Sequence, residues 1–234
     1  MKRSAHEVWN TADRARLEHF ASLVAADEAG LPPHRRADRE FVIGETRLIR
    51  ELAAQAGTVI EFGSGIGRSL LPGAREFPTT RFLGLDSAPE PVRLMALLAE
   101  EEGLANLRGL LADVRRVPLR DSSVDRVLIP YQTFGIFLGR VRDRSLVEAR
   151  RILRPGGALY IGGFANLDLA ADCYPAWGLT PSRIDPETRL VHLDGFDSLW
   201  ATEDQVLVHA ERAGFALVHR QDCELGFSLV LGPR

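Results

Sequence analysis

The chain has 234 residues, of which 45% are hydrophobic and 26% charged, and its formal net charge is -3. This composition is typical of a globular protein with a sizeable core. The slight excess of acid gives no support to a nucleic-acid partner, which a strongly basic face would indicate. No apolar run approaches the roughly 18 residues of a membrane-spanning helix, so we expect no membrane partner.

The compartment and the metal content follow from the first residues and the cysteines. The amino-terminal segment has no apolar run of signal-peptide length. The two cysteines, Cys173 and Cys223, lack the C-x-x-C spacing of a metal or redox motif, and no histidine stands at metal-ligand spacing beside them. We therefore expect a cytoplasmic protein without a bound metal ion.

The chain begins with two predicted helices. The first covers about residues 4–29, a loop rich in proline and charge follows over 31–40, and the second helix covers about 44–56. We expect residues 1–43 to form an amino-terminal helical cap and residues 44–234 to form the main domain.

Strands and helices then alternate along the chain. Short apolar runs bounded by turn residues predict the strands, and apolar positions at helical spacing predict the helices. Such alternation predicts a mostly parallel sheet with helices on both faces. The strands are expected at residues 58–62, 81–86, 107–112, 124–130 and 157–163, and the helices at 67–76, 89–102 and 141–153.

Residues 164–200 interrupt the alternation. This segment contains several turn-forming prolines and one candidate strand at 188–193, so we expect an insertion. A helix over 202–213 follows, opened by the capping-box pattern Thr202-Glu203-Asp204-Gln205. The last two strands, at about 215–220 and 225–231, are expected to form an antiparallel hairpin.

The most informative motif is the glycine-rich run Glu61-Phe62-Gly63-Ser64-Gly65-Ile66-Gly67, which directly follows a predicted strand. Glycine permits positive φ and a close approach of a ligand to the backbone. A dinucleotide site requires a third small residue where this chain has Arg68, and a phosphate-binding loop requires Lys at that position. Both of those sites are therefore disfavoured.

Two further predicted strands also end in an acid, Asp86 and Asp113. The carboxyl ends of parallel strands meet at one edge of the sheet, where ligands bind in open α/β folds. Each acid has a structural alternative, because a carboxylate after a strand also caps helices. Asp86 could in this way cap the helix that starts near Pro89.

The glycine turn, the two acids and the turn Leu153-Arg154-Pro155-Gly156-Gly157 together resemble the class I S-adenosylmethionine-dependent methyltransferases. The resemblance covers about residues 45–165 and the final hairpin. It implies a Rossmann-like methyltransferase fold, which is a doubly wound, mostly parallel seven-stranded sheet with a carboxyl-terminal antiparallel hairpin. It also implies methyl transfer, with S-adenosyl-L-methionine as the cofactor.

The resemblance assigns roles to the residues at the strand ends. Asp86 would accept from the ribose hydroxyls and Asp113 from the adenine amine, while the glycine turn would lie against the methionine end. Glu61 would hold a water molecule or, indirectly, the amino group. The expected cofactor-binding residues are Glu61, Gly63, Ser64, Gly65, Gly67, Asp86, Ser87, Asp113, Val114 and Pro130.

On the acceptor side, Tyr131 and Phe134 belong to an aromatic stretch that follows the fourth strand in many small-molecule methyltransferases. Tyr131 would line the sulfonium or orient the acceptor, although it could equally be a core or lid aromatic. We expect Trp9 to act as a lid, so that Trp9, Tyr131 and Phe134 form the substrate-binding set. His192, in the insertion, is the leading candidate for a general base, and Tyr131 and His192 are the candidate catalytic residues.

The expected function is methyl transfer to an amine or hydroxyl of a small molecule, with natural-product and sugar intermediates as candidate classes. An RNA or protein methyltransferase and a cofactor-binding fold-mate without transfer activity remain alternatives. We expect a monomer or a homodimer.

Overall fold

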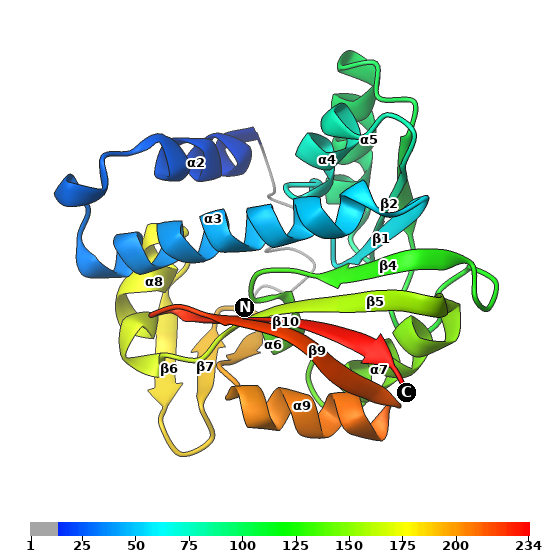
Figure 1. Cartoon of the computed structure of the whole chain (residues 1–234). Coiled ribbons are helices and arrows are strands. Elements are labelled where there is room, and N and C mark those ends of the chain that lie inside the picture. Colours follow the sequence, from blue (N-terminus) through cyan, green and yellow to red (C-terminus); the bar gives the residue numbers. More distant parts are fainter. Residues whose placement is uncertain (1–13) are drawn as a thin grey trace.

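The computed structural model describes residues 14–234, and its centre is a seven-stranded sheet (Figure 1). The strands of the sheet, in chain order, are β1 (Thr58–Phe62), β2 (Arg81–Asp86), β3 (Leu107–Leu111), β4 (Val124–Ile129), β5 (Leu153–Phe164), β9 (Phe215–Asp222) and β10 (Gly226–Pro233). Their spatial order is β3-β2-β1-β4-β5-β10-β9. Strands β1 to β5 pair in parallel and β10 runs antiparallel to β5 and β9. The predicted sheet and carboxyl-terminal hairpin are confirmed.

Helices cover both faces of the sheet. One face packs against α3 (Pro33–Ala54), α4 (Leu70–Glu76) and α5 (Pro89–Glu101), and the other against α7 (Arg140–Ile152) and α9 (Glu203–Arg212). Alternation along β1 serves both layers, because Val59 points into the first core and Ile60 into the second. Figure 1 shows α3 lying across the sheet on the side opposite α9.

The loop predicted over residues 31–40 is wrong, because α3 already begins at Pro33. Pro32 is its N-cap residue and Pro33 its first residue, where proline is favoured because no backbone donor is required. The predicted boundary of the cap at residue 43 lies within this continuous helix, so the division into 1–43 and 44–234 stays a prediction. The first predicted helix is described from residue 14 onward, as α2 (Arg14–Ala25), and a short 3-10 turn, η1 (Glu28–Gly30), follows it.

The insertion is more regular than expected. It contains η2 (Leu167–Leu169), α8 (Ala170–Ala176) and a three-stranded antiparallel sheet of β6 (Pro181–Asp185), β7 (Leu190–Leu193) and β8 (Asp197–Leu199). A third core joins it to the first half of α3, with Phe41, Phe164 and Trp200 among its buried members. The insertion is thereby fixed beside the carboxyl end of β5.

No helix within residues 14–234 combines the length and the apolar character that crossing a bilayer requires.

Candidate functional site

The structure brings the glycine turn and Asp86 together at the carboxyl ends of β1 and β2. One carboxylate oxygen of Asp86 accepts a hydrogen bond from the Gly65 N–H at 2.8 Å, and the other accepts from the Ala88 N–H at 2.9 Å. Ala88 is the N-cap residue of α5. Asp86 therefore stabilises the start of α5, as the structural alternative expected. It also holds the glycine turn, and a carboxylate retains acceptor capacity for further donors.

The three glycines of the turn have different surroundings. All have positive φ, at 66°, 53° and 84° for Gly63, Gly65 and Gly67. A Cβ atom would lie 2.5 Å from the Thr133 side chain at Gly63 and 2.8 Å from the Met95 sulfur at Gly67, whereas nothing lies within 4 Å at Gly65. Gly63 and Gly67 thus allow close packing, and Gly65 leaves open space for a ligand.

Two buried polar atoms beside the turn have no hydrogen-bond partner among the described residues. They are Oε2 of Glu61 and the hydroxyl of Ser64, in residues that are only 3% and 5% exposed. Buried acceptors without partners are rare in folded proteins and call for an explanation. The amino-acid end of S-adenosylmethionine carries both a donating ammonium and an accepting carboxylate, so a carboxyl and a hydroxyl without partners fit that group.

Burial raises the pKa of Glu61 well above its usual value of 4.5, with Glu45 and Asp86 adding to the effect and Arg68 opposing it. The folded protein therefore keeps a proton that the unfolded chain releases above that pH, and stability falls as the pH rises from 4.5 toward the folded pKa. We expect Glu61→Gln, which cannot ionise, to remove this loss. Urea unfolding at about pH 5 and about pH 8 measures it, with the exposed Glu90→Gln as the control. An unchanged pH dependence in Glu61→Gln would contradict the assignment.

The residues expected to bind adenine are already engaged in contacts within the protein. Both Asp113 oxygens accept from the guanidinium of Arg115, at 2.5 to 3.0 Å, and this pairing lowers the Asp113 pKa. Val114 is 8% exposed and packs in the core, and Ser87 lies exposed between Asp86 and α5. The roles of Asp113, Val114 and Ser87 toward adenine and ribose stay predictions.

Tyr131 follows the buried Pro130 at the end of β4 and is held by α3. Its φ is 58°, which is uncommon for a residue with a side chain. The Tyr131 N–H donates to Glu45 Oε1 and its hydroxyl donates to Asp38 Oδ1, both at 2.6 Å. The ring makes edge contacts with Phe20, Phe41, Phe164 and Trp177.

Sequence reasoning missed Asp38 and Glu45, although both are buried on α3. The signal was present, because the two acids lie about two turns apart on the stripe of apolar positions that includes Phe41 and Leu48. The sequence patterns gave Arg68 no role beyond its mismatch with the dinucleotide and phosphate-loop motifs. The Arg68 guanidinium pairs with Glu45 Oε2 at 2.5 Å and lies 4.8 Å from the Phe20 ring and 5.0 Å from the Tyr131 ring.

Of the other predicted substrate and catalytic residues, the structure describes Phe134 and His192, and it brings neither to Tyr131. Phe134, in α6 (Thr133–Ile136), packs in the core on the α7 side, with the Arg142 guanidinium over its ring. His192 lies on β7 between the buried Val191 and Leu193, so it points to the opposite face of that strand. Trp9 lies outside the described residues.

His192 nevertheless has defined partners on its own face of the insertion. Its Nδ1 atom lies 2.8 Å from Asp197 Oδ1 and its Nε2 atom 3.2 Å from the Arg183 guanidinium. Its role as a base stays a prediction.

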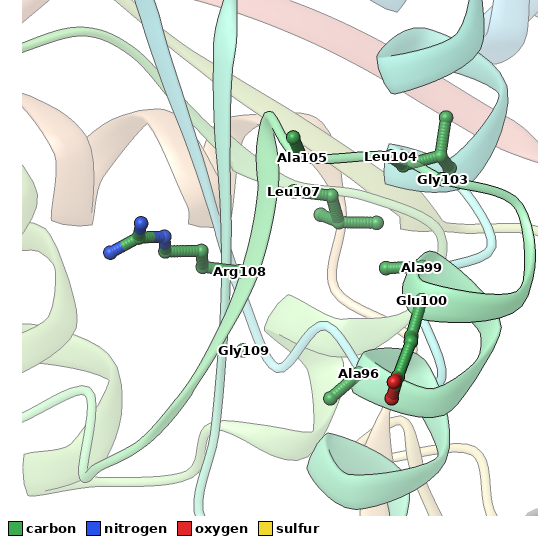
Figure 2. A pocket seen from close by; sticks show the side chains of 9 residues that line it. All are labelled: Ala96, Ala99, Glu100, Gly103, Leu104, Ala105, Leu107, Arg108 and Gly109. Atoms are coloured by element: carbon green, nitrogen blue, oxygen red, sulfur yellow. The ribbon is translucent and has the colours of Figure 1, made fainter.

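A depression of about 490 Å³ lies between α5 and β3, away from this chemistry (Figure 2). Its lining includes Leu107 and Arg108 at the amino end of β3, and Figure 2 shows Leu107 pointing toward α5 and Arg108 away from it. Ligands of open α/β sheets bind at the carboxyl ends, so this depression is not the candidate site. Among residues 14–234, no three His, Cys, Asp or Glu side chains are grouped as a metal site would require.

Comparison with known proteins identifies the kind of domain that carries this turn. Residues 59–157 match the family described as a methyltransferase domain. The chain is similar to the ubiquinone/menaquinone biosynthesis C-methyltransferase UbiE of Acidiphilium cryptum, with 43% identity over 34% of this chain and 32% of the relative. It is also similar to the malonyl-[acyl-carrier protein] O-methyltransferase of Methylococcus capsulatus, with 32% identity over 55% of this chain and 46% of the relative. The chain thus spans less than half the length of these two relatives.

More distant similarities extend over more of the chain. A tRNA (guanine-N(7)-)-methyltransferase of Photobacterium profundum is 27% identical over 70% of this chain and 68% of that protein. The structure of the CcbJ methyltransferase of Streptomyces caelestis covers 89% of this chain and 92% of its own, with a TM-score of 0.62 and 19% identity. Together with the glycine turn and the strand-end acid, these findings show that residues 59–157 form a methyltransferase domain of the S-adenosylmethionine-dependent type, in a chain with the Rossmann-like methyltransferase fold.

Proposed function

We propose that this protein transfers the methyl group of S-adenosylmethionine to an amine or hydroxyl of a small molecule. The observation that carries the proposal is the arrangement at the ends of β1 and β2. There, Gly65 faces open space, Glu61 and Ser64 hold unpartnered buried acceptors, and Asp86 fixes the turn. These groups would hold the amino-acid end and the ribose of the cofactor.

The chemistry requires alignment more than acid–base groups. The sulfonium of the bound cofactor activates the methyl carbon, so holding an acceptor in line supplies most of the acceleration. Burial and Asp38 raise the Tyr131 pKa well above its ordinary value, so its hydroxyl stays protonated and donates to Asp38. Tyr131 would therefore act through its ring, which provides a cation-friendly wall, and not as a base.

The small size of the acceptor is supported by the enclosure around Tyr131. Aromatic side chains from α2, α3, β5 and the insertion pack against this ring, and an acceptor held beside it would meet apolar walls, which suits a compact molecule. By their names, one relative acts in ubiquinone and menaquinone biosynthesis as a C-methyltransferase and another is an O-methyltransferase of malonyl-[acyl-carrier protein], so neither is named for a nucleic-acid substrate.

An RNA acceptor is the second candidate, favoured by the similarity to a tRNA (guanine-N(7)-)-methyltransferase. The two are distinguished by incubating the protein and radiolabelled S-adenosylmethionine with bulk tRNA or with a small-molecule extract of the cells that supplied the tRNA. We expect the label in the small-molecule pool, and label on the tRNA would favour the RNA acceptor. Binding of the cofactor without transfer to either pool would favour the fold-mate alternative.

The proposed cofactor is tested by calorimetric titration. We expect S-adenosylmethionine and S-adenosylhomocysteine to bind and NAD not to bind, because Arg68 occupies the position where a dinucleotide site needs a small residue. Binding of NAD at micromolar affinity, with no binding of S-adenosylmethionine or S-adenosylhomocysteine, would refute the proposal.

A further inference from the structure

A buried ion pair connects the glycine turn with α3. Arg68 directly follows Gly67, and its guanidinium pairs with the Glu45 carboxylate at 2.5 Å, with side chains that are 16% and 0% exposed. Phe20 and Tyr131 place their rings within 4.8 and 5.0 Å of the same guanidinium carbon. The Tyr131 ring that would border the sulfonium therefore already borders a cation.

Glu45 is fixed as the counter-charge to this cation. Its Oε1 atom accepts from the Tyr131 N–H at 2.6 Å and from the Tyr160 hydroxyl at 3.1 Å, and its Oε2 atom accepts from Arg68. Gly162 leaves the necessary space, because a Cβ atom there would lie 2.5 Å from Glu45 Oε1. With both oxygens bonded and the side chain fully buried, the carboxylate is held in one place beside Arg68.

Other acids border the cluster but do not pair with Arg68. Glu61 is buried with its pKa raised, Asp86 bonds two backbone N–H groups, and Asp38 accepts from the Tyr131 hydroxyl. Glu45 is therefore the group that balances the Arg68 charge. Without it, a buried positive charge would stand uncompensated beside Tyr131, at the carboxyl end of β4.

We propose that Glu45 and Arg68 determine how strongly the cofactor site distinguishes the methyl donor from its product. The donor carries a positive sulfur and the product a neutral one, while the rest of the two molecules is alike. Two positive charges in one partly buried crevice repel each other, and the neutralised pair removes this penalty for the donor. The proposal rests on the proposed function, since it requires that the cofactor occupies this crevice.

The test is the ratio of the dissociation constant of S-adenosylmethionine to that of S-adenosylhomocysteine, measured calorimetrically on the full chain. Glu45→Gln keeps the size and an acceptor for Tyr131 but leaves Arg68 uncompensated. We expect this ratio to rise at least about fivefold. The double variant Glu45→Gln/Arg68→Gln removes both charges and should return the ratio to within about twofold of the wild-type value.

A structural role alone would weaken both ligands equally and leave the ratio unchanged. The matched control is the exposed pair of Arg50 on α3 with Glu76 on α4, also joined at 2.5 Å. The Glu76→Gln variant should keep the wild-type ratio. An unchanged ratio in Glu45→Gln, or a raised ratio that persists in the double variant, would overturn the proposal.

Two further outcomes are separable. If Glu45→Gln does not fold, Arg68→Gln replaces it. This variant leaves the Glu45 carboxylate without its counter-charge, which should lower the ratio, and an unchanged or raised ratio would overturn the proposal. If the wild-type chain binds neither S-adenosylmethionine nor S-adenosylhomocysteine, the proposed function itself fails. That result differs from an unchanged ratio in a chain that binds both compounds.

Discussion

Asp86→Ala should weaken the binding of S-adenosylhomocysteine by about 1–3 kcal/mol, the usual loss for a charge-assisted hydrogen bond. The same change should lower the free energy of unfolding by about 1–2 kcal/mol, because the Gly65 and Ala88 N–H groups lose their acceptor. Asp86→Asn retains one amide oxygen and should do less harm to both. Calorimetry and urea unfolding on the same preparations measure the two losses.

A matched control separates binding from stability. Asp125 also accepts from two backbone N–H groups, those of Gly57 and Thr58, at 2.9 and 2.8 Å. These groups lie at the amino end of β1, opposite the crevice. Asp125→Ala should therefore destabilise the fold and leave the affinity unchanged. Normal affinity in Asp86→Ala, with a lowered melting temperature, would mean that Asp86 serves only the local backbone.

Deletion of residues 1–29 should reduce turnover of S-adenosylmethionine about a hundredfold. The expected reason is that the acceptor would be less well aligned with the methyl group and water would enter the site. The removed segment contains α2, whose Phe20 contacts both Tyr131 and the Arg68 guanidinium. The seven-stranded sheet lies outside the deletion, so the melting temperature should change little by comparison. Release of S-adenosylhomocysteine, with an acceptor found by screening, gives the rate.

Single substitutions within α2 refine this experiment. Phe20→Ala should reproduce part of the loss, whereas Val24→Ala, at a side chain that is 40% exposed on the same helix, should not. Normal turnover by the truncated protein would show that the segment is not a lid. The part of the lid prediction that concerns Trp9 lies outside the described residues.

Features fixed by short-range physics were predictable from the sequence. The glycine turn, the strand-end Asp86 and the capping box all depend on residues close together in the chain. The capping box is a clear case, because Thr202 and Gln205 make both reciprocal bonds in the structure. The alternation of apolar runs likewise predicted the positions of the parallel strands along the chain.

The acceptor side depends on contacts between distant residues, which no local pattern encodes. Asp38 and Glu45 bond to Tyr131, which lies 93 and 86 residues further along the chain. The prolines and charges of residues 31–40 made the start of α3 look like a solvated loop. Arg68 appeared as a mismatch because its partner lies on another element. Periodicity in β7 is also too short to show which face of the strand His192 occupies.

A crystal structure with S-adenosylhomocysteine tests the central claim most directly. The account predicts the ribose hydroxyls at Asp86, the homocysteine end on the turn over residues 63–67 beside the Glu61 and Ser64 acceptors, and the sulfur facing Tyr131. Density for the product in the depression between α5 and β3, or anywhere else away from the carboxyl ends of β1 and β2, would contradict it.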